Sequence, residues 1–317
     1  MATVRIQKSS FYWLFLLETV GSADITATVE GIGMTVSTPV WRSVANGANV
    51  APAVTQCLRE AGLLTCEAFP DAARLNRAAK ALYGTWEGPE FRGQATFFAN
   101  DGRYYEEIIN QDSVVPTREN NWHDLFNACI WMQFPHTKQR LNQLHVDDIN
   151  SVGLHPRTAR RNRLTHFDEC GVVLVVEDEH RDVANTLLGA LASHAWEEVL
   201  WHQRALWSST IQPYMFGHAN LEMMLSPFIG LTGKWLAVCV PDGFSSLPVV
   251  EKWKVVDAAL VARLDALDNF QPQHILRPLP LLGIPGWWHE QTMAFYQNKD
   301  YFRPQRNGVP RTIQLPL

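Results

Sequence analysis

Residues 119–138 read ENNWHDLFNACIWMQFPHTK, and this pattern predicts a buried helix at the centre of the fold. Asn121 is a typical N-cap residue, and Asp124, three residues later, suits the positive end of the helix dipole. Apolar residues then fall on every face until a proline ends the stretch, which is typical of a helix buried all round. His123, Asp124 and Asn127 should therefore point into protein or into a cleft, where they need hydrogen-bond partners.

Two interpretations of these three polar residues stay open. In the first, Asp124 only caps the helix, while His123 and Asn127 bond to neighbouring backbone groups. In the second, the three residues form part of a binding or catalytic site. His123 and Asn127 are four residues apart and so share a face of the helix, as a common site requires.

The composition is that of a well-packed globular protein and argues against some classes of function. Of 317 residues, 46% are hydrophobic and 19% are charged, which argues against disorder, and the net charge of -5 argues against nucleic-acid binding. The five cysteines are scattered and form no CxxC pair, which favours reduced thiols and a cytoplasmic location and gives no zinc signature. The apolar run at residues 11–17 is too short to span a membrane.

The N-terminal residues do not read as part of the fold. The codons of Glu30 and Gly31 would resemble a ribosome-binding sequence, and they lie just upstream of Met34. We therefore expect residues 1–33 to be a translated leader and residues 34–317 to be a single globular domain. A mass of the native protein that includes the leader would contradict this expectation.

Helical periodicity dominates the rest of the chain. It predicts helices at residues 54–61, 72–83, 136–150, 182–207, 215–225 and 250–267. Residues 95–98 and 104–109 flank an Asp-Gly turn and predict a β-hairpin. Residues 171–176 and 235–240 are apolar runs that predict buried strands.

These elements predict an α+β fold, a predominantly helical single domain with a small β-sheet built from the hairpin and the two strands. Strands and helices alternate after residue 165, so an α/β layered arrangement is the alternative. From about residue 271 the chain is rich in proline and aromatic residues. These large side chains need burial, so we expect the stretch to wrap the core as an ordered coil.

Two further pairs of polar residues are candidates for a site. Asp168 and Glu169 shortly precede the predicted strand at residues 171–176. His218 and Glu222 are four residues apart on one helix face, where histidine and carboxylate can bind a metal or exchange protons. The plainer alternatives are exposed acids in a turn and a hydrogen-bonded pair in the core.

His194, Glu198 and His202 also fall on one helix face. Steps of four residues can place ligands around a metal, but the HExxH motif of zinc proteases is absent. We therefore expect an ordinary solvated polar face there.

Basic residues gather next to the central helix. Between residues 117 and 163 the chain has seven Lys and Arg against four acids, although the whole protein is acidic. Arginine binds phosphate and carboxylate groups well, so this region suits a small anionic substrate, with a solvated loop as the alternative. The candidate substrate-binding residues are Arg118, Lys138, Arg160, Arg161 and Arg163, with Trp287 and Trp288 as residues that either line a pocket or only pack.

Four blocks of sequence carry a family resemblance. They comprise residues 121–128 with 134–135 and Lys138, residues 164–165 with 167–169 and 171–173, residues 216–219 with 221–222 and 230–233, and residues 282–288 with 302–304. Together they resemble a proteobacterial family catalogued as domain of unknown function 3025, from about residue 36 to residue 304. The family has no assigned activity, so the resemblance implies which positions belong together and implies no chemistry.

The leading functional hypothesis is a cytoplasmic enzyme that acts on a small anionic substrate. Its catalytic residues would be His123, Asp124, Asn127, Asp168, Glu169, His218 and Glu222. A divalent metal that activates water for hydrolysis would be held by His123, Asp168, His218 and Glu222. Without a metal, the same residues would serve general acid–base hydrolysis. The alternative is a non-catalytic binding or scaffold protein whose polar residues form a buried hydrogen-bond network.

Overall fold

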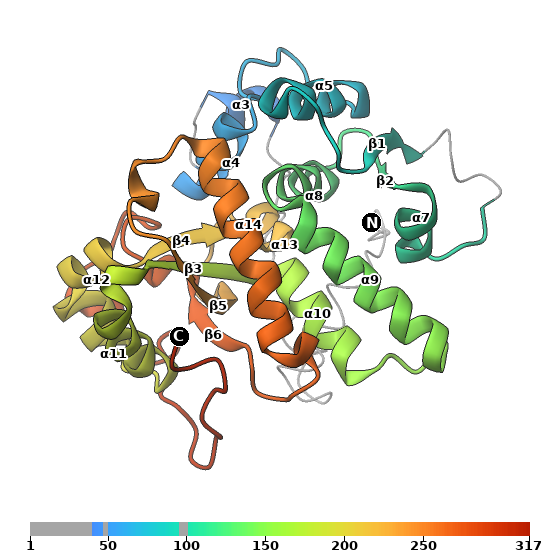
Figure 1. The fold of residues 1–317 in the computed structure, drawn as a ribbon. Helices are drawn as coiled ribbons and strands as arrows, with labels where there is room; N and C mark the ends of the chain where they lie inside the picture. The colour runs from blue at the N-terminus through green and yellow to red at the C-terminus, as the bar shows by residue number, and fades with distance from the viewer. Residues whose placement is uncertain (1–39, 47–49, 95–100) are drawn as a thin grey trace, which may run out of the picture. The chain divides into compact units, whose positions relative to one another are not determined.

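Two parallel strands form the centre of the larger sheet in the computed structural model (Figure 1). β3 (Gly171–Glu177) pairs with β5 (Thr232–Val240), and every residue of β3 is buried. β4 (Gln212–Met215) and β6 (Arg277–Pro280) pair antiparallel with β3 and β5, so the strand order is β4-β3-β5-β6. The two strands predicted from apolar runs are therefore confirmed.

Both edge strands contain proline. Pro213 stands opposite Leu174, and Pro278 stands opposite Lys234. Proline has no N–H to donate to a ladder, so within sheets it is confined to edges. For the same reason the sequence pattern predicts neither strand, since proline counts against a strand assignment.

Helices make up most of the structure, which describes residues 40–46, 50–94 and 101–317. They are α3 (Trp41–Ala45), α4 (Pro52–Glu60), α5 (Ala72–Tyr83), α7 (Tyr105–Asp112), α8 (Trp122–Gln133), α9 (Pro135–Val152), α10 (Ala159–Cys170), α11 (Arg181–Ala192), α12 (Arg204–Thr210), α13 (His218–Met223), α14 (Val249–Ala266) and α15 (Met293–Tyr296). Among these described helices, none is both long and apolar enough to cross a bilayer.

A second sheet has two strands, and neither of them pairs with a strand of the larger sheet. β1 (Glu90–Gly93) pairs in parallel with β2 (Val114–Thr117). α10 and α14 both pack against β5, and Figure 1 shows α14 lying across the larger sheet. The predominance of helix, with one small mixed sheet and one two-stranded parallel sheet, confirms the α+β class in place of the layered alternative.

The central helix begins and ends where the sequence predicts. Asn121 caps α8, because its Oδ1 accepts a hydrogen bond of 2.9 Å from the backbone N–H of Asp124. Every residue of α8 is buried apart from His123. Pro135 opens α9 one residue after α8 ends, so the two helices follow each other almost without a loop.

The predicted β-hairpin is wrong in the part that the structure describes. Its second strand, residues 104–109, instead forms the start of α7, while residues 95–98 lie outside the described residues. The carboxylate of Glu107 accepts a bond of 2.8 Å from the N–H of Tyr104 and so caps the helix. This cap outweighs the β propensity of the aromatic residues. The predicted leader at residues 1–33 also lies outside the described residues.

The described residues from 40 onward belong to one compact unit, and side-chain bonds help to hold the C-terminal stretch against β5. Gln314 is fully buried. Its Oε1 accepts a bond of 3.0 Å from the N–H of Ala237, and its Nε2 donates to the carbonyl of Trp235 at 3.2 Å. The stretch is therefore held by the pairing of β6 with β5 and, near the end of the chain, by the side chain of Gln314.

Gly217, between β4 and α13, should tolerate no side chain. A Cβ there would lie 2.6 Å from backbone atoms of Cys170, which cannot move away cheaply. Gly217→Ala should therefore lower the free energy of unfolding by about 1–3 kcal/mol, measured by urea denaturation. Gly189→Ala in α11 is the control, because apart from its chain neighbours and the backbone of its own helix no described atom lies within 4 Å of the added Cβ. Equal stability of the two variants would contradict the close approach.

Candidate metal centre

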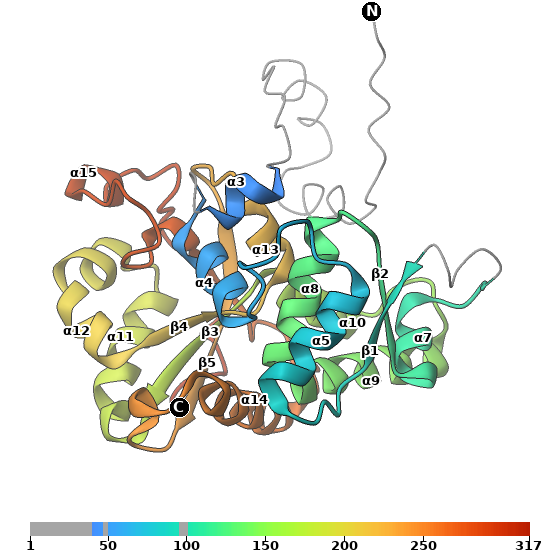
Figure 2. The same cartoon turned by 90° about the horizontal axis from the view of Figure 1, so that it is seen from above.

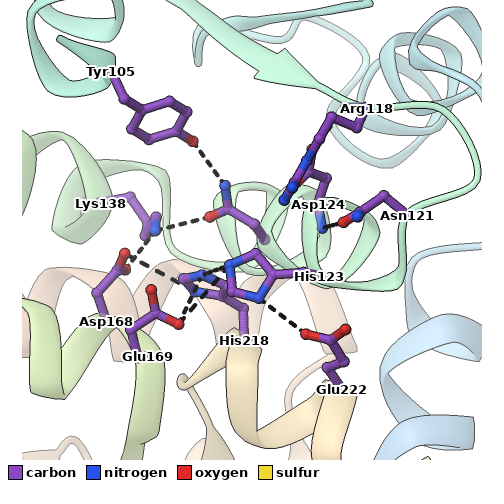
Figure 3. Close-up of polar contacts among 11 residues, drawn as sticks. Tyr105, Arg118, Asn121, His123, Asp124, Lys138, Asp168, Glu169, His218 and Glu222 are labelled. Carbon is purple, nitrogen blue, oxygen red and sulfur yellow. Dashed lines mark hydrogen bonds and ion pairs between the residues drawn. The ribbon is translucent and has the colours of Figure 1, made fainter. Parts of the chain in front are cut away.

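Three helices bring two histidines and a glutamate together (Figure 3). The Nε2 atoms of His123 in α8 and His218 in α13 are 3.1 Å apart. Oε2 of Glu169, in the last turn of α10, is 3.4 Å from Nε2 of His218 and 3.9 Å from Nε2 of His123. These residues, hereafter the His–Glu cluster, form a group whose ligand atoms all lie within 4.8 Å of one another.

The spacing of the three atoms matches the coordination sphere of one metal ion. A point equally distant from both nitrogens and the oxygen lies about 2 Å from each, and Zn–N and Zn–O bonds are about 2.0–2.2 Å long. Ligand atoms in a tetrahedral zinc site are therefore roughly 3.3–3.6 Å apart. Of the three distances in the cluster, 3.4 Å falls within this range, 3.1 Å is slightly shorter and 3.9 Å is slightly longer. Two histidines and one carboxylate leave a coordination position for water.

Glu222 fixes the orientation of the His123 ring. Its Oε2 lies 3.1 Å from Nδ1 of His123, and because a carboxylate only accepts, Nδ1 carries the hydrogen and donates it. Nε2 of His123 then presents its lone pair to the cluster. A carboxylate behind the far nitrogen is typical of histidines that bind metals. The side chain of His123 is 29% exposed, so solvent reaches the cluster from this side.

His218 is the buried member of the cluster, with a side chain only 4% exposed. Its Nδ1 faces Asp168, whose backbone acts on the pKa of His218 as a weak hydrogen-bond partner and whose carboxylate oxygen Oδ2 is 3.9 Å away. With the hydrogen on Nδ1 facing Asp168, Nε2 of His218 presents a lone pair to the cluster as His123 does.

A buried lysine organises the residues behind His218. The ammonium group of Lys138, only 5% exposed, forms an ion pair with Asp168 and donates a bond of 3.0 Å to Oδ1 of Asn127. Nδ2 of Asn127 in turn donates a bond of 2.9 Å to the hydroxyl of Tyr105. These bonds commit the charge of Asp168 to the lysine, so Asp168 supports the cluster without joining it.

Burial and neighbouring charges set the protonation of the cluster. Burial raises the pKa of Glu169 to about 7, and the charge of Asp168 adds to this effect. Burial alone would lower the pKa of His123, but the bond to Glu222 and the charge of Glu169 outweigh it and raise the pKa. Burial, with the charges of His123 and Lys138, holds the pKa of His218 well below its usual value. Mildly alkaline solution therefore favours the deprotonated ligands that a metal needs.

Contacts between α13 and the end of α10 bring His218 to the cluster. Asn220 is fully buried and donates a bond of 3.1 Å to the carbonyl of Cys170. The N–H of Gly217 bonds to the carbonyl of Gly171 at 2.8 Å, where α10 passes directly into β3. α13 also packs against α8, and Figures 1 and 2 agree in showing the two helices side by side. The sequence pattern does not point to Asn220, because no local signal reports such a tertiary bond.

Asp124, a predicted catalytic residue, is used in the structure to join α8 to the end of β2. Arg118 donates three bonds to its carboxylate, from its backbone N–H at 2.6 Å, from Nε at 2.9 Å and from Nη2 at 2.7 Å. The charges of Asp124 and Arg118 are thus committed to each other. This pairing favours a structural role for both residues.

Most of the predicted substrate-binding residues also have partners away from the cluster. Arg160 pairs with Asp148, and Arg163 donates to the carbonyl of Phe270 at 2.6 Å. Trp287 lines a separate groove, which no residue of the cluster lines. Trp288 packs against a neighbouring histidine. Of the predicted set, Lys138 lies beside the cluster through its ion pair with Asp168, and the buried Arg161 donates to the carbonyl of Leu154 at 2.8 Å.

The face of His194, Glu198 and His202 forms no cluster among the described residues. Nδ1 of His194 lies 3.1 Å from the carbonyl of Arg303, and His202 pairs with Glu197 at 3.5 Å. The helical run is interrupted here, because α11 ends at Ala192 and a single π-helical turn follows. The three side chains therefore do not meet.

The geometry favours a different set of ligands from the one that the sequence suggests. Asp168 pairs with Lys138, and Glu222 reaches the far nitrogen of His123. Glu169, selected as catalytic but not as a ligand, occupies the ligand position. Neighbouring residues of a helix point about 100° apart, so only the packing of α10 decides which of two adjacent acids faces the histidines.

The fold and site together define an α+β protein with a His–Glu cluster that is partly open to solvent. The chain belongs to the family described as protein of unknown function (DUF3025), whose model matches residues 90–306. This confirms the resemblance, although the match begins at residue 90 and not near residue 36. No curated protein and no solved structure matches the chain. The whole cluster lies inside the matched range.

Glu169→Gln should stabilise the metal-free protein at alkaline pH. The folded-state pKa of Glu169, about 7, lies above the unfolded value of about 4.3. Its ionised form therefore opposes folding above pH 7, and this penalty disappears below the unfolded pKa. Because glutamine carries no charge, the melting temperature should rise by roughly 2–6 °C at pH 8, and the gain should shrink towards pH 5.

Differential scanning fluorimetry in the presence of a chelator measures this effect. Glu119→Gln, at an exposed position, is the control and should leave the melting temperature unchanged at both pH values. A loss of stability in Glu169→Gln at pH 8 would show that the buried carboxylate serves the fold instead.

Proposed function

We propose that this protein is a metal-dependent hydrolase in which His123, His218 and Glu169 hold one divalent ion. The observation that carries the proposal is the spacing of the three donor atoms, which all lie within 4.8 Å of one another. An ion bound by two histidines and a carboxylate lowers the pKa of its bound water to about 7 and polarises a substrate oxygen. The partial exposure of His123 and Glu169, 29% and 20%, gives water and substrate access.

The residues around the cluster have supporting roles in this proposal. Glu222 orients His123 by accepting the hydrogen of Nδ1. The ion pair of Lys138 and Asp168 lies behind His218 and favours the tautomer whose Nε2 lone pair faces the ion. We further propose a cytoplasmic location, because all five cysteines are free thiols. As the partner we propose a small anionic molecule and not nucleic acid.

Two other functions make different predictions for the same residues. Two histidines and one carboxylate also bind ferrous iron in oxygenases, so the identity of the ion separates hydrolysis from oxygen chemistry. In a non-catalytic protein, the polar residues would form only a buried hydrogen-bond network. The bonds of Lys138 to Asp168 and Asn127 are already part of such a network. Such a protein would hold no metal at the cluster.

Elemental analysis of untagged protein tests the proposal. We expect about one zinc or manganese ion per chain in the wild type. His123→Ala and His218→Ala should each lose it, because two ligands cannot hold the ion alone. His202→Ala, an exposed histidine that pairs with Glu197, is the matched control and should keep it. Metal-free wild type, or metal retained in His123→Ala, would contradict the proposal, and stoichiometric iron would contradict hydrolysis.

Metal affinity should fall as the solution becomes acidic. Glu169, with a pKa of about 7, and His123, with a raised pKa, take up protons that the ion must displace. Between pH 7 and pH 6 the affinity for zinc should therefore fall by about tenfold for each displaced proton. Competition with a chromophoric chelator measures this. An affinity that stays constant from pH 8 to pH 6 would mean that these two residues do not bind the ion.

A further inference from the structure

We propose that the groove lined by Trp287 binds a small zwitterion of the amino-acid type. The ammonium group of the ligand would lie at Glu60 and its carboxylate at Lys252, with a large apolar side chain against the aromatic residues of the groove. No residue of the His–Glu cluster lines this groove, so the inference concerns a second site and does not depend on the proposed function.

Segments that are far apart in the sequence form the groove. It has a volume of about 420 Å³, and its lining comes from α4, from α12 and β4, from the start of α14 and from residues 285–287. β4 is an outermost strand of the larger sheet, so no further strand covers this side. Ligand pockets commonly measure roughly 300–1,000 Å³, and the groove is therefore large enough for a molecule the size of an amino acid.

Two opposite charges line the groove without forming an ion pair. Glu60 in α4 and Lys252 in α14 are both lining residues, and the charge of Lys252 acts on the carboxyl group of Glu60. Among the described residues, however, no cation forms an ion pair with Glu60 and no carboxylate forms one with Lys252. Opposite charges that face one groove but do not meet suit a ligand that carries both charges.

The carboxylate of Glu60 is half-buried and held in place by neighbouring donors. Its Oε1 accepts a bond of 2.9 Å from Nε2 of Gln56, and the indole N–H of Trp253 acts on it as a further donor. Burial raises the pKa of Glu60, and these donors and the charge of Lys252 oppose the rise only in part. A buried charge is normally paired, and the ammonium group of a ligand would supply the missing partner.

Tyr214 in β4 connects the two charged residues. Burial and the charge of Glu60 raise the pKa of its hydroxyl group. Its ring packs edge-on against Phe244, with 6.2 Å between the ring centroids. Nζ of Lys252 lies 5.8 Å from the centroid of the same Phe244 ring. Both charges therefore lie near one side chain that lines the groove.

Tryptophan side chains supply the apolar part of the groove. Trp287 is partly exposed, while Trp207 and Trp253 are buried beneath the groove. Aromatic rings pack well against apolar and aromatic groups, and their faces also attract ammonium groups. Among ligands that carry both charges, this lining favours an amino acid with an aromatic or large apolar side chain over a small polar one.

Isothermal titration with L-phenylalanine as the probe tests the site. Two analogues separate the charges, because 3-phenylpropionate lacks the ammonium group and phenethylamine lacks the carboxylate. We expect the wild type to bind phenylalanine, and each analogue about tenfold more weakly or worse, because one contact between charged groups is lost. A wild type that does not bind phenylalanine, or that binds both analogues as tightly, overturns the inference.

Two variants assign the charges to their residues. Glu60→Gln keeps an acceptor for Gln56 and should weaken the binding of phenylalanine and phenethylamine by about tenfold, but not that of 3-phenylpropionate. Lys252→Met should weaken phenylalanine and 3-phenylpropionate instead. Lys254→Met is the matched control, because Lys254 is exposed, pairs with Glu251 and does not line the groove.

The remaining outcomes separate this site from the metal centre and from a purely structural effect. An equal loss for all three ligands in Glu60→Gln would mean that this carboxylate only supports the fold, and it would overturn the assignment. Elemental analysis should find the same metal content in Glu60→Gln and Lys252→Met as in the wild type. A wild type that binds phenylalanine but holds no metal would contradict the proposed function alone.

Discussion

The close packing of α13 against the junction of α10 and β3 is the contact on which the site depends. Gly217 lies against the backbone of Cys170, where a Cβ would be only 2.6 Å away, and Asn220 bonds to the same residue from the next turn. β3 is buried along its whole length and anchors this junction in the core. His218, directly after Gly217, is thereby placed against His123 and Glu169.

Most charged residues around the cluster are neutralised by an ion pair, and a few polar atoms are not. Arg118 neutralises Asp124, and Lys138 neutralises Asp168, so these charges stay within the fold. What remains are two imidazole nitrogens and a carboxylate oxygen that face one another. Burial of such groups shifts their pKa values and opposes folding, which is typical of residues kept for function instead of stability.

Local signals in the sequence carry part of the fold, and tertiary packing decides the rest. The cap at Asn121 and the proline at residue 135 define α8 and α9, because both act through their own backbone. The segment at residues 104–109 misleads, because its β propensity is overruled by a helix cap. The sequence selects His123, His218 and Glu169, but the choice of Glu169 over its neighbour Asp168 as a ligand comes from the packing of α10. The chain of bonds from Tyr105 through Asn127 and Lys138 to Asp168 spans four helices, α7 to α10, and no local sequence signal reports it.

Anomalous diffraction at the zinc absorption edge, from crystals of zinc-loaded protein, tests the central claim most directly. The account predicts one strong peak about 2 Å from Nε2 of His123, from Nε2 of His218 and from the carboxylate of Glu169. A peak at any other residues would contradict it. So would the absence of a peak while the two histidine nitrogens remain in direct contact at 3.1 Å.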